Sequence, residues 1–230
     1  LSSSEKLAWV STKTREDHGD RARPALIVGV GYCLDGQTRP RSAYGALRTR
    51  DLTPSNDRRW LDLTAAARRE SAPPLDIGPP GGAEAFLEFL IEELRPFIAE
   101  HYTTDPDDQT LVGSSLGGLF SLYALVQKPS AFANYVANSP ALWWNEREIM
   151  AYPSPTTLGH GKARSVFLSV GGDEVNDAPW EMLENCRAFA DRLGRLDGLR
   201  LISHVFEGET HTSVIPAAMS RGLRCVLSQS

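Results

Sequence analysis

Short apolar segments alternate with segments of helical period along the chain, and this alternation predicts the fold. Five apolar runs are expected to be buried strands, at 24–32, 109–114, 132–140, 165–172 and 200–208. Segments with helical spacing lie at 83–102, 116–127, 144–150, 179–196 and 212–227. Strands that alternate with helices favour a mostly parallel sheet whose two faces are covered by helices.

Two stretches lack this pattern. Residues 1–23 are rich in Ser, Arg, Asp and Glu, and we expect the end of a short helix followed by an exposed loop. Residues 33–82 show no clear period, and we expect a long loop that is functional or partly disordered. No repeat or linker divides the 230 residues, so a single domain, 1–230, is expected. The first residue is Leu1 and not Met, which is expected of a processed or trimmed N-terminus.

Charge and composition narrow the classes of function. The chain has 24 Lys and Arg against 29 Asp and Glu, a net charge of −5, so no nucleic-acid partner is expected. No apolar run is long enough to span a membrane. Three cysteines, Cys33, Cys186 and Cys225, are an odd number at no metal-like spacing, which argues against a disulfide framework but leaves one bridge open. The oligomeric state and the compartment, cytoplasmic or periplasmic, stay open.

A candidate nucleophile lies where the second apolar run gives way to a helix. Residues 113–117 fit G-x-S-x-G with Ser115 at the centre, which is the strand-turn-helix context of a nucleophile elbow. We expect that the turn is too tight for side chains at positions 113 and 117, which explains the glycines there. A helix cap or a phosphate-binding turn is the alternative, but the Lys-Ser/Thr pair of a P-loop is missing.

A serine hydroxyl needs a base, and the base needs an orienting acid. Among five histidines, His211 follows the last predicted strand and so lies at the same sheet edge as Ser115, although a loop or capping role is the alternative. The acid should follow the fourth predicted strand, where Glu174 is preferred and Asp173 is the second candidate, with Asp177 nearby. These acids could equally be loop caps or surface charges.

An oxyanion hole needs two backbone N–H donors. Leu116 follows the candidate nucleophile directly and is expected to supply the first. Gly31 or Tyr32, at the end of the first predicted strand, is the candidate for the second. A glycine that merely ends a strand is the alternative.

Six segments in this order resemble the putative esterase family of α/β-hydrolases, and in particular its siderophore (enterochelin and salmochelin) esterases. The segments are IVGVGY, RTRDLTP, GGAEAFLEFLIEELRPFIAEHY, LVGSSLGGLFSLYAL, NSPALWWN and GETHTSV, within residues 24 to 227. The resemblance implies an α/β-hydrolase fold, a three-layer α/β/α sandwich. It also implies hydrolysis of a small-molecule carboxylic ester without a metal or an organic cofactor. Family members usually have further strands upstream, so either an N-terminal part is missing or the sheet is smaller.

The resemblance also assigns roles to single residues. It places the nucleophile on Ser115, the base on His211 and the oxyanion loop on Gly31 and Tyr32. Some siderophore esterases are Ser–His dyads, which leaves the role of an acid open.

Substrate contacts follow from the same resemblance. Arg48, in RTRDLTP, would face an anionic substrate; the alternative is a salt bridge between Arg48 and Asp51 that fixes the loop. Trp143 and Trp144 would wall an aromatic acyl or catechol pocket, or would pack in the core.

The sequence therefore predicts a serine hydrolase that cleaves carboxylic esters through an acyl-enzyme. An acyltransferase on the same scaffold and a non-catalytic binding protein that has kept the fold are the two alternatives. A siderophore trilactone, a feruloyl or acetyl sugar ester and a simple acyl ester all remain possible substrates, and the stretch 33–82 is expected to decide among them.

Overall fold

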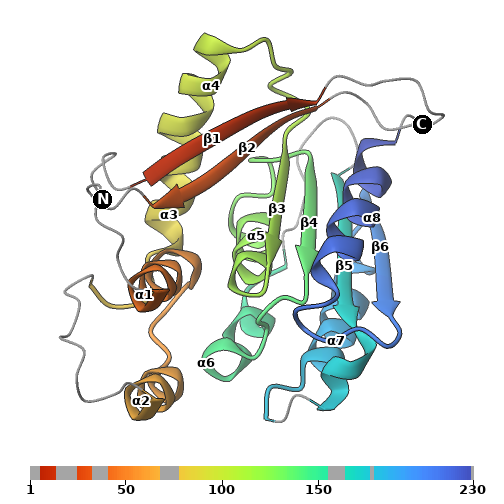
Figure 1. The fold of residues 1–230 in the computed structure, drawn as a ribbon. Helices are drawn as coiled ribbons and strands as arrows, with labels where there is room; N and C mark the ends of the chain where they lie inside the picture. The colour runs from red at the N-terminus through yellow and green to blue at the C-terminus, as the bar shows by residue number, and fades with distance from the viewer. Residues whose placement is uncertain are drawn as a thin grey trace.

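The computed structural model describes residues 6–13, 25–32, 41–67, 78–154, 164–176 and 179–228. Its central sheet has four strands, all parallel, that follow one another in chain order across the sheet. These strands are β3 (Thr110–Ser114), β4 (Asn134–Asn138), β5 (Arg164–Gly171) and β6 (Leu199–Phe206). The predicted parallel strands are confirmed, and all four C-terminal ends lie at one edge of the sheet (Figure 1).

Helices cover both faces of this sheet. On one face, α5 (Leu116–Gln127) packs on β3 and β4, and α7 (Met182–Leu193) packs on β5. On the other, α8 (Ile215–Leu227) packs on β4 and β5 and lies in front of the sheet in Figure 1. The side chains of a strand alternate between its faces, and both β4 and β5 bury apolar side chains on each of the two faces. The three-layer α/β/α sandwich is therefore confirmed.

The sheet divides the hydrophobic core into two parts, one on each face. Val136 and Phe167 pack against Val226 of α8, whereas Tyr135 and Leu168 belong to the larger core with α5 and α7. Both strands are almost fully buried, which explains why they read as continuous apolar runs in the sequence.

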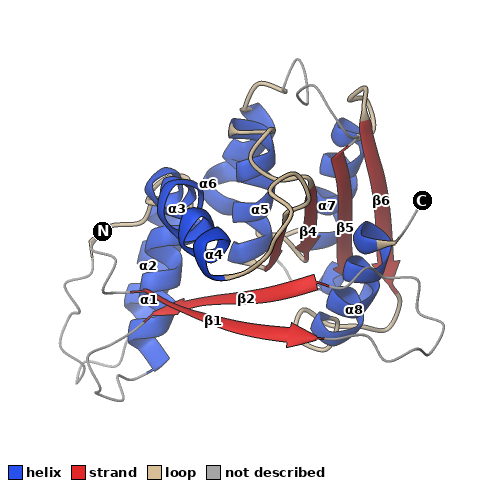
Figure 2. Cartoon of the chain, turned by 90° about the horizontal axis from the view of Figure 1, so that it is seen from above, coloured by secondary structure: helices blue, strands red, loops and turns tan. Residues whose placement is uncertain are grey.

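A separate antiparallel pair precedes the sheet. β1 (Lys6–Lys13) pairs with β2 (Ala25–Tyr32), from Lys6 opposite Tyr32 to Lys13 opposite Ala25. Figure 2 shows this pair as a ribbon of its own beside the four-stranded sheet. The prediction of a strand at 24–32 is confirmed, but the prediction that it is buried is wrong, because the residues of β2 are half-buried or, at Ile27 and Val30, exposed. The prediction of a helix end at the start of the chain is wrong for residues 6–13, whose partners lie from 12 positions later (Ala25 for Lys13) to 26 positions later (Tyr32 for Lys6), a separation that local composition does not reveal.

The stretch 33–82 is not a long loop. Two helices form within it, α1 (Arg41–Leu52) and α2 (Arg58–Ala67), so the prediction of a stretch without regular structure is wrong for those residues. Besides Leu47, α1 buries two polar side chains, Thr49 and Asp51. The apolar period that marks a helix is therefore interrupted, although α1 packs against α3 (Ala83–Phe89) and α5.

The long helix expected at 83–102 is built from three consecutive helical segments. α3 is followed by the π-helical η2 (Leu90–Leu94) and by α4 (Arg95–His101). Pro96 lies in the first turn of α4 and has no N–H to donate to the preceding turn, which accounts for the wider turn before it. The expected helix at 144–150 is likewise divided, into α6 (Trp144–Arg147) and the 3-10 helix η3 (Glu148–Ala151).

Candidate active site

Ser115 lies in a sharp turn between β3 and α5. Its backbone has φ 59° and ψ −119°, a conformation that few residues other than glycine adopt. Its N–H donates to the carbonyl of Asn138 at 3.0 Å, and its own carbonyl accepts from the N–H of Ala141 at 3.1 Å. The loop after β4 therefore holds the strained turn in place, and the half-buried hydroxyl is presented at the C-terminal edge of the sheet.

The two glycines of the motif differ in their steric role. A Cβ at Gly113 would lie 2.0 Å from the carbonyl oxygen of Gly117, so position 113 excludes every side chain. A Cβ at Gly117 would meet nothing within 4 Å, so the expectation of a steric requirement there is wrong. Gly118 has such a requirement instead, because its Cβ would lie 2.9 Å from the carbonyl oxygen of Asn138.

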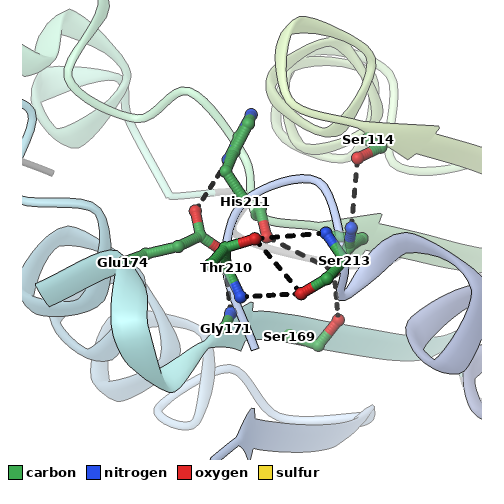
Figure 3. A network of polar contacts seen from close by, with 9 residues as sticks. Ser114, Ser169, Gly171, Glu174, Thr210, His211 and Ser213 are labelled. Atoms are coloured by element: carbon green, nitrogen blue, oxygen red, sulfur yellow. Dashed lines mark hydrogen bonds and ion pairs between the residues drawn. The ribbon is translucent and has the colours of Figure 1, made fainter. Parts of the chain in front are cut away.

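An acid and a histidine meet at the same edge of the sheet. His211 follows β6, and its Nδ1 lies 2.7 Å from Oε2 of Glu174, in the 3-10 turn η4 (Gly172–Asn176) after β5 (Figure 3). The Glu174 side chain is fully buried, while 34% of the His211 side chain is exposed. Asp173 is exposed and contributes a backbone N–H to the carbonyl of Glu209. Asp177 lies outside the described residues.

Three donors hold the Glu174 carboxylate. Besides His211, the Ser139 hydroxyl donates to Oε1 at 2.6 Å and the Gly171 N–H donates to the same oxygen at 2.7 Å. Burial by itself raises the pKa of the Glu174 carboxyl, but the hydrogen bonds from His211, Ser139 and Gly171 outweigh it and leave this pKa below its ordinary value. Glu174 is therefore an anion across the neutral range, beside the imidazole of His211.

A chain of contacts connects the serine to this pair. The Ser115 N–H is bonded to Asn138, the next residue Ser139 is bonded to Glu174, and Glu174 is bonded to His211. The loops after β3, β4, β5 and β6 therefore adjoin at one edge. The Ser115 hydroxyl makes no hydrogen bond with any described residue, and catalytic hydrogen bonds in unliganded enzymes often tighten only when substrate binds.

The candidate oxyanion donors come from two elements. Leu116 is the first residue of α5, so its N–H belongs to the first turn, where N–H groups lack partners within the helix. Gly31 and Tyr32 end β2 opposite Leu7 and Lys6, and the Tyr32 hydroxyl donates to the carbonyl of Leu47 at 3.1 Å. Convergence of these donors on one point stays a prediction.

The alternative role of Arg48, a salt bridge with Asp51, is not observed in the structure. Asp51 is fully buried and pairs with Arg50, whose Nε lies 2.8 Å from Asp51 Oδ1. Arg48 is half-buried and, within the described part of the chain, forms no ion pair. It lines a cavity of about 60 Å³ together with the ends of β2 and α1, and with Tyr44 and Phe86.

The two predicted tryptophans have different surroundings. Trp144 is fully buried and donates from Nε1 to the carbonyl of Ser55 at 3.1 Å, so it packs in the core. Trp143 is half-buried, and its ring centroid lies 4.2 Å from that of Trp180. Trp60 lies 5.5 Å from Trp143 and completes a cluster of half-buried indoles, Trp60, Trp143 and Trp180. Sequence reasoning missed Trp60 and Trp180, because α2 was not predicted and Trp180 falls within the stretch 179–196 that was predicted only as an amphipathic helix.

The segment that carries Trp143 is strained and firmly held. Asn145, Glu146 and Arg147 have φ values of 44°, 55° and 64°. Asp57 accepts the N–H of Asn145 at 2.8 Å, and the hydroxyl of Ser55 accepts from its side-chain amide at 2.9 Å. Strain of this kind persists only where neighbouring groups fix the backbone, so the indole cluster has a defined geometry.

Metal-binding clusters and membrane-spanning helices are both absent from the part of the chain that the structure describes. No three His, Cys, Asp or Glu side chains there are grouped so that they could hold a metal ion. None of its helices is both long enough and apolar enough to cross a bilayer.

Comparison with known sequences finds one family and several relatives. The sequence profile of the family described as "Putative esterase" matches residues 20–212. The Ferri-bacillibactin esterase BesA of Bacillus subtilis (strain 168) is 35% identical over 210 residues, which cover 89% of this chain and 68% of the relative. The Siderophore triacetylfusarinine C esterase of Aspergillus fumigatus is 31% identical over 224 residues, or 86% and 69% of the two chains.

Solved structures agree with these relatives. The BES protein from Bacillus cereus superposes with a TM-score of 0.70 at 33% identity, over 90% of this chain and 71% of that one. The siderophore hydrolase EstA from Aspergillus nidulans gives a TM-score of 0.67 at 26% identity, over 91% and 73%. The predicted α/β-hydrolase fold is confirmed.

Proposed function

Because the chain belongs to the Putative esterase family, and is therefore a carboxylic-ester hydrolase, we propose that Ser115, His211 and Glu174 are its catalytic triad. The observation that carries this proposal is the pairing of a fully buried Glu174 with His211 at 2.7 Å, on the sheet edge where Ser115 is held at φ 59°. Ser115 would be the nucleophile, His211 the general base, and Glu174 the acid that orients the histidine.

The reaction proceeds through an acyl-enzyme. Glu174 accepts a hydrogen bond from the Nδ1–H of His211 and remains an anion, which leaves Nε2 unprotonated and able to take the proton of the Ser115 hydroxyl. The Ser115 oxygen attacks the ester carbonyl, and His211 then gives its proton to the leaving alcohol. Water, deprotonated by the same imidazole, releases the acid and restores the serine. The Glu174 anion stabilises the imidazolium in both steps.

The oxyanion of each tetrahedral intermediate lies at the start of α5. The Leu116 N–H follows the nucleophile directly, and the twelve-residue helix places the positive end of its dipole at this point. The end of β2, at Gly31 or Tyr32, is the proposed source of the second donor. Glycine at position 31 permits close approach of a substrate to the backbone.

The proposed substrate is a siderophore ester that carries aryl and anionic groups. Two relatives are named as siderophore esterases, one for ferri-bacillibactin and one for triacetylfusarinine C. The half-buried indoles of Trp60, Trp143 and Trp180 offer flat surfaces suited to an aromatic ring. Arg48 offers a guanidinium that pairs with no described carboxylate. A catecholate trilactone has both features, whereas a simple acyl ester has neither.

Product analysis tests the reaction class. With a catecholate trilactone or a short p-nitrophenyl ester, we expect release of the free acid, and kcat/KM should be higher for the trilactone. The assay is repeated with an added acceptor alcohol, and the products are identified by mass spectrometry. Acyl transfer to the alcohol as the main product would favour the acyltransferase alternative. A folded chain that turns over neither ester and is not labelled by a fluorophosphonate would be a binding protein.

Arg48→Gln tests the proposed anion contact. We expect kcat/KM for the trilactone to fall about 10- to 100-fold, the cost of one hydrogen bond to a charged group, mainly through KM. Hydrolysis of the neutral p-nitrophenyl ester should stay near the wild-type rate. Arg187→Gln, on the exposed side of α7, is the matched control. Equal losses on both esters would mean that Arg48 supports the fold and not substrate recognition.

A further inference from the structure

A buried polar network lies behind Glu174, across the ends of three strands. Ser114, Asn138 and Ser169 occupy one register position on β3, β4 and β5. The Asn138 amide donates to the Ser114 hydroxyl at 3.1 Å, and its oxygen accepts from the Ser169 hydroxyl at 3.1 Å (Figure 3). Asn138 and Ser169 are fully buried. The triad chemistry uses none of these side chains.

Ser139 connects this network to the acid. Its side chain is fully buried, its N–H donates to the carbonyl of Ser169 at 2.7 Å, and its hydroxyl lies 2.6 Å from Glu174 Oε1. Its φ of 40° is one that glycine adopts without strain and serine does not. The backbone alone thus favours glycine at position 139, and what serine adds there is the hydroxyl.

We propose that Ser139 is a positioning residue for the triad: its hydroxyl fixes Glu174 Oε1, so that Oε2 stays aimed at His211 Nδ1. The proposal rests on the function proposed above. An ionised carboxylate only accepts hydrogen bonds, so the Ser139 proton is directed at Oε1, and the longer 3.4 Å contact with Asn138 is secondary. The Gly171 N–H reaches the same oxygen from a second direction. Two donors on Oε1 therefore set the plane of the carboxylate.

The hydroxyl also sets how tightly the acid–histidine pair holds its proton. A donor to the carboxylate favours the anion, so its removal raises the proton affinity of Glu174 and, through it, of the Glu174–His211 pair. One hydrogen bond to a charged group corresponds to about one pH unit. Among the described residues, ionisable groups on the elements packed around the pair include Cys186 and Arg187 on α7, Asp173 in η4, and Glu207 and Glu209 after β6. All of these stay the same in the variants below.

The test compares Ser139→Ala and Ser139→Gly with Ser169→Ala. Both changes at position 139 remove the hydroxyl, and the glycine also relieves the positive φ, so it remains folded if the alanine does not. Ser169→Ala removes an equally buried hydroxyl that contacts Asn138 and not Glu174. For each variant, kcat and KM are measured against pH. The His211 ring is also titrated by NMR with ¹⁵N-labelled histidine, with its signal assigned by a His211→Gln variant.

In the Ser139 variants we expect kcat to fall about 10- to 100-fold with little change in KM, as a small misplacement of a catalytic group causes. The acid limb of kcat/KM and the NMR midpoint of His211 should both move up by about one pH unit. Ser169→Ala should move neither. Wild-type values in both Ser139 variants, or an equal shift in Ser169→Ala, would overturn the proposal. A shifted His211 titration in a chain without ester turnover would leave the positioning intact and contradict the proposed function alone.

Discussion

Replacing Ser115 with alanine is expected to lower kcat for ester hydrolysis by about three to six orders of magnitude. Without the hydroxyl no acyl-enzyme forms, and what remains is the catalysis that the oxyanion donors and substrate binding supply. The expected loss is large because the strained turn presents this one oxygen to the substrate, at the edge where His211 is held by Glu174. Steady-state rates and labelling of the intact protein by a fluorophosphonate measure the effect, and the label should disappear in the variant.

The neighbouring serine supplies the matched control. Ser114 is the last residue of β3, directly before the turn, and its hydroxyl accepts from the Asn138 amide at 3.1 Å. Ser114→Ala should stay within about tenfold of the wild-type rate, since it removes one hydrogen bond that is not part of the reaction. The assignment of the nucleophile would be contradicted if Ser115→Ala kept its rate or its label. It would also be contradicted if the rate were lost in Ser114→Ala alone.

Glu174→Gln is expected to lower kcat about 10⁴-fold, with KM less affected. The glutamine is nearly isosteric but carries no charge, so it cannot stabilise the imidazolium, and its NH₂ group can hold His211 in the wrong tautomer. In the wild type the pKa of Glu174 is lowered by its hydrogen bonds, in spite of burial, so the carboxylate is charged in the neutral range. Its contribution to stability is present above the carboxyl's unfolded-state pKa and is lost as the pH falls through the lower folded-state value.

Asp173→Asn is the control for the acid. Asp173 precedes Glu174 directly and was the second candidate from the sequence, yet it is exposed and its N–H bonds to Glu209. We expect a rate near that of the wild type, measured on the same esters. If Glu174→Gln instead kept most of the wild-type rate, the enzyme would act as a Ser–His dyad. If Asp173→Asn lost most of that rate, Asp173 and not Glu174 would be the catalytic acid.

The strands that could be predicted from the sequence are those whose own residues form an apolar run. β4 and β5 are buried on both faces, so their apolar runs needed no tertiary information. β1 and α1 were missed for the opposite reason. β1 depends on pairing with β2, and α1 buries the polar side chains of Thr49 and Asp51, which hides the apolar period of a helix.

The sequence by itself was enough to single out the proposed nucleophile, Ser115. Gly113 has no room for a Cβ and Ser115 needs a positive φ, and both constraints act within five residues of chain. Only the tertiary structure distinguished Glu174 from Asp173 as the proposed acid. Adjacent residues carry the same local signal, and the proposal depends on which carboxylate is buried against donors from the loop after β4, from β5 and from the loop after β6. Contacts between segments so far apart in the chain leave no mark in the local sequence, which is also why Ser139 could be recognised only in the folded molecule.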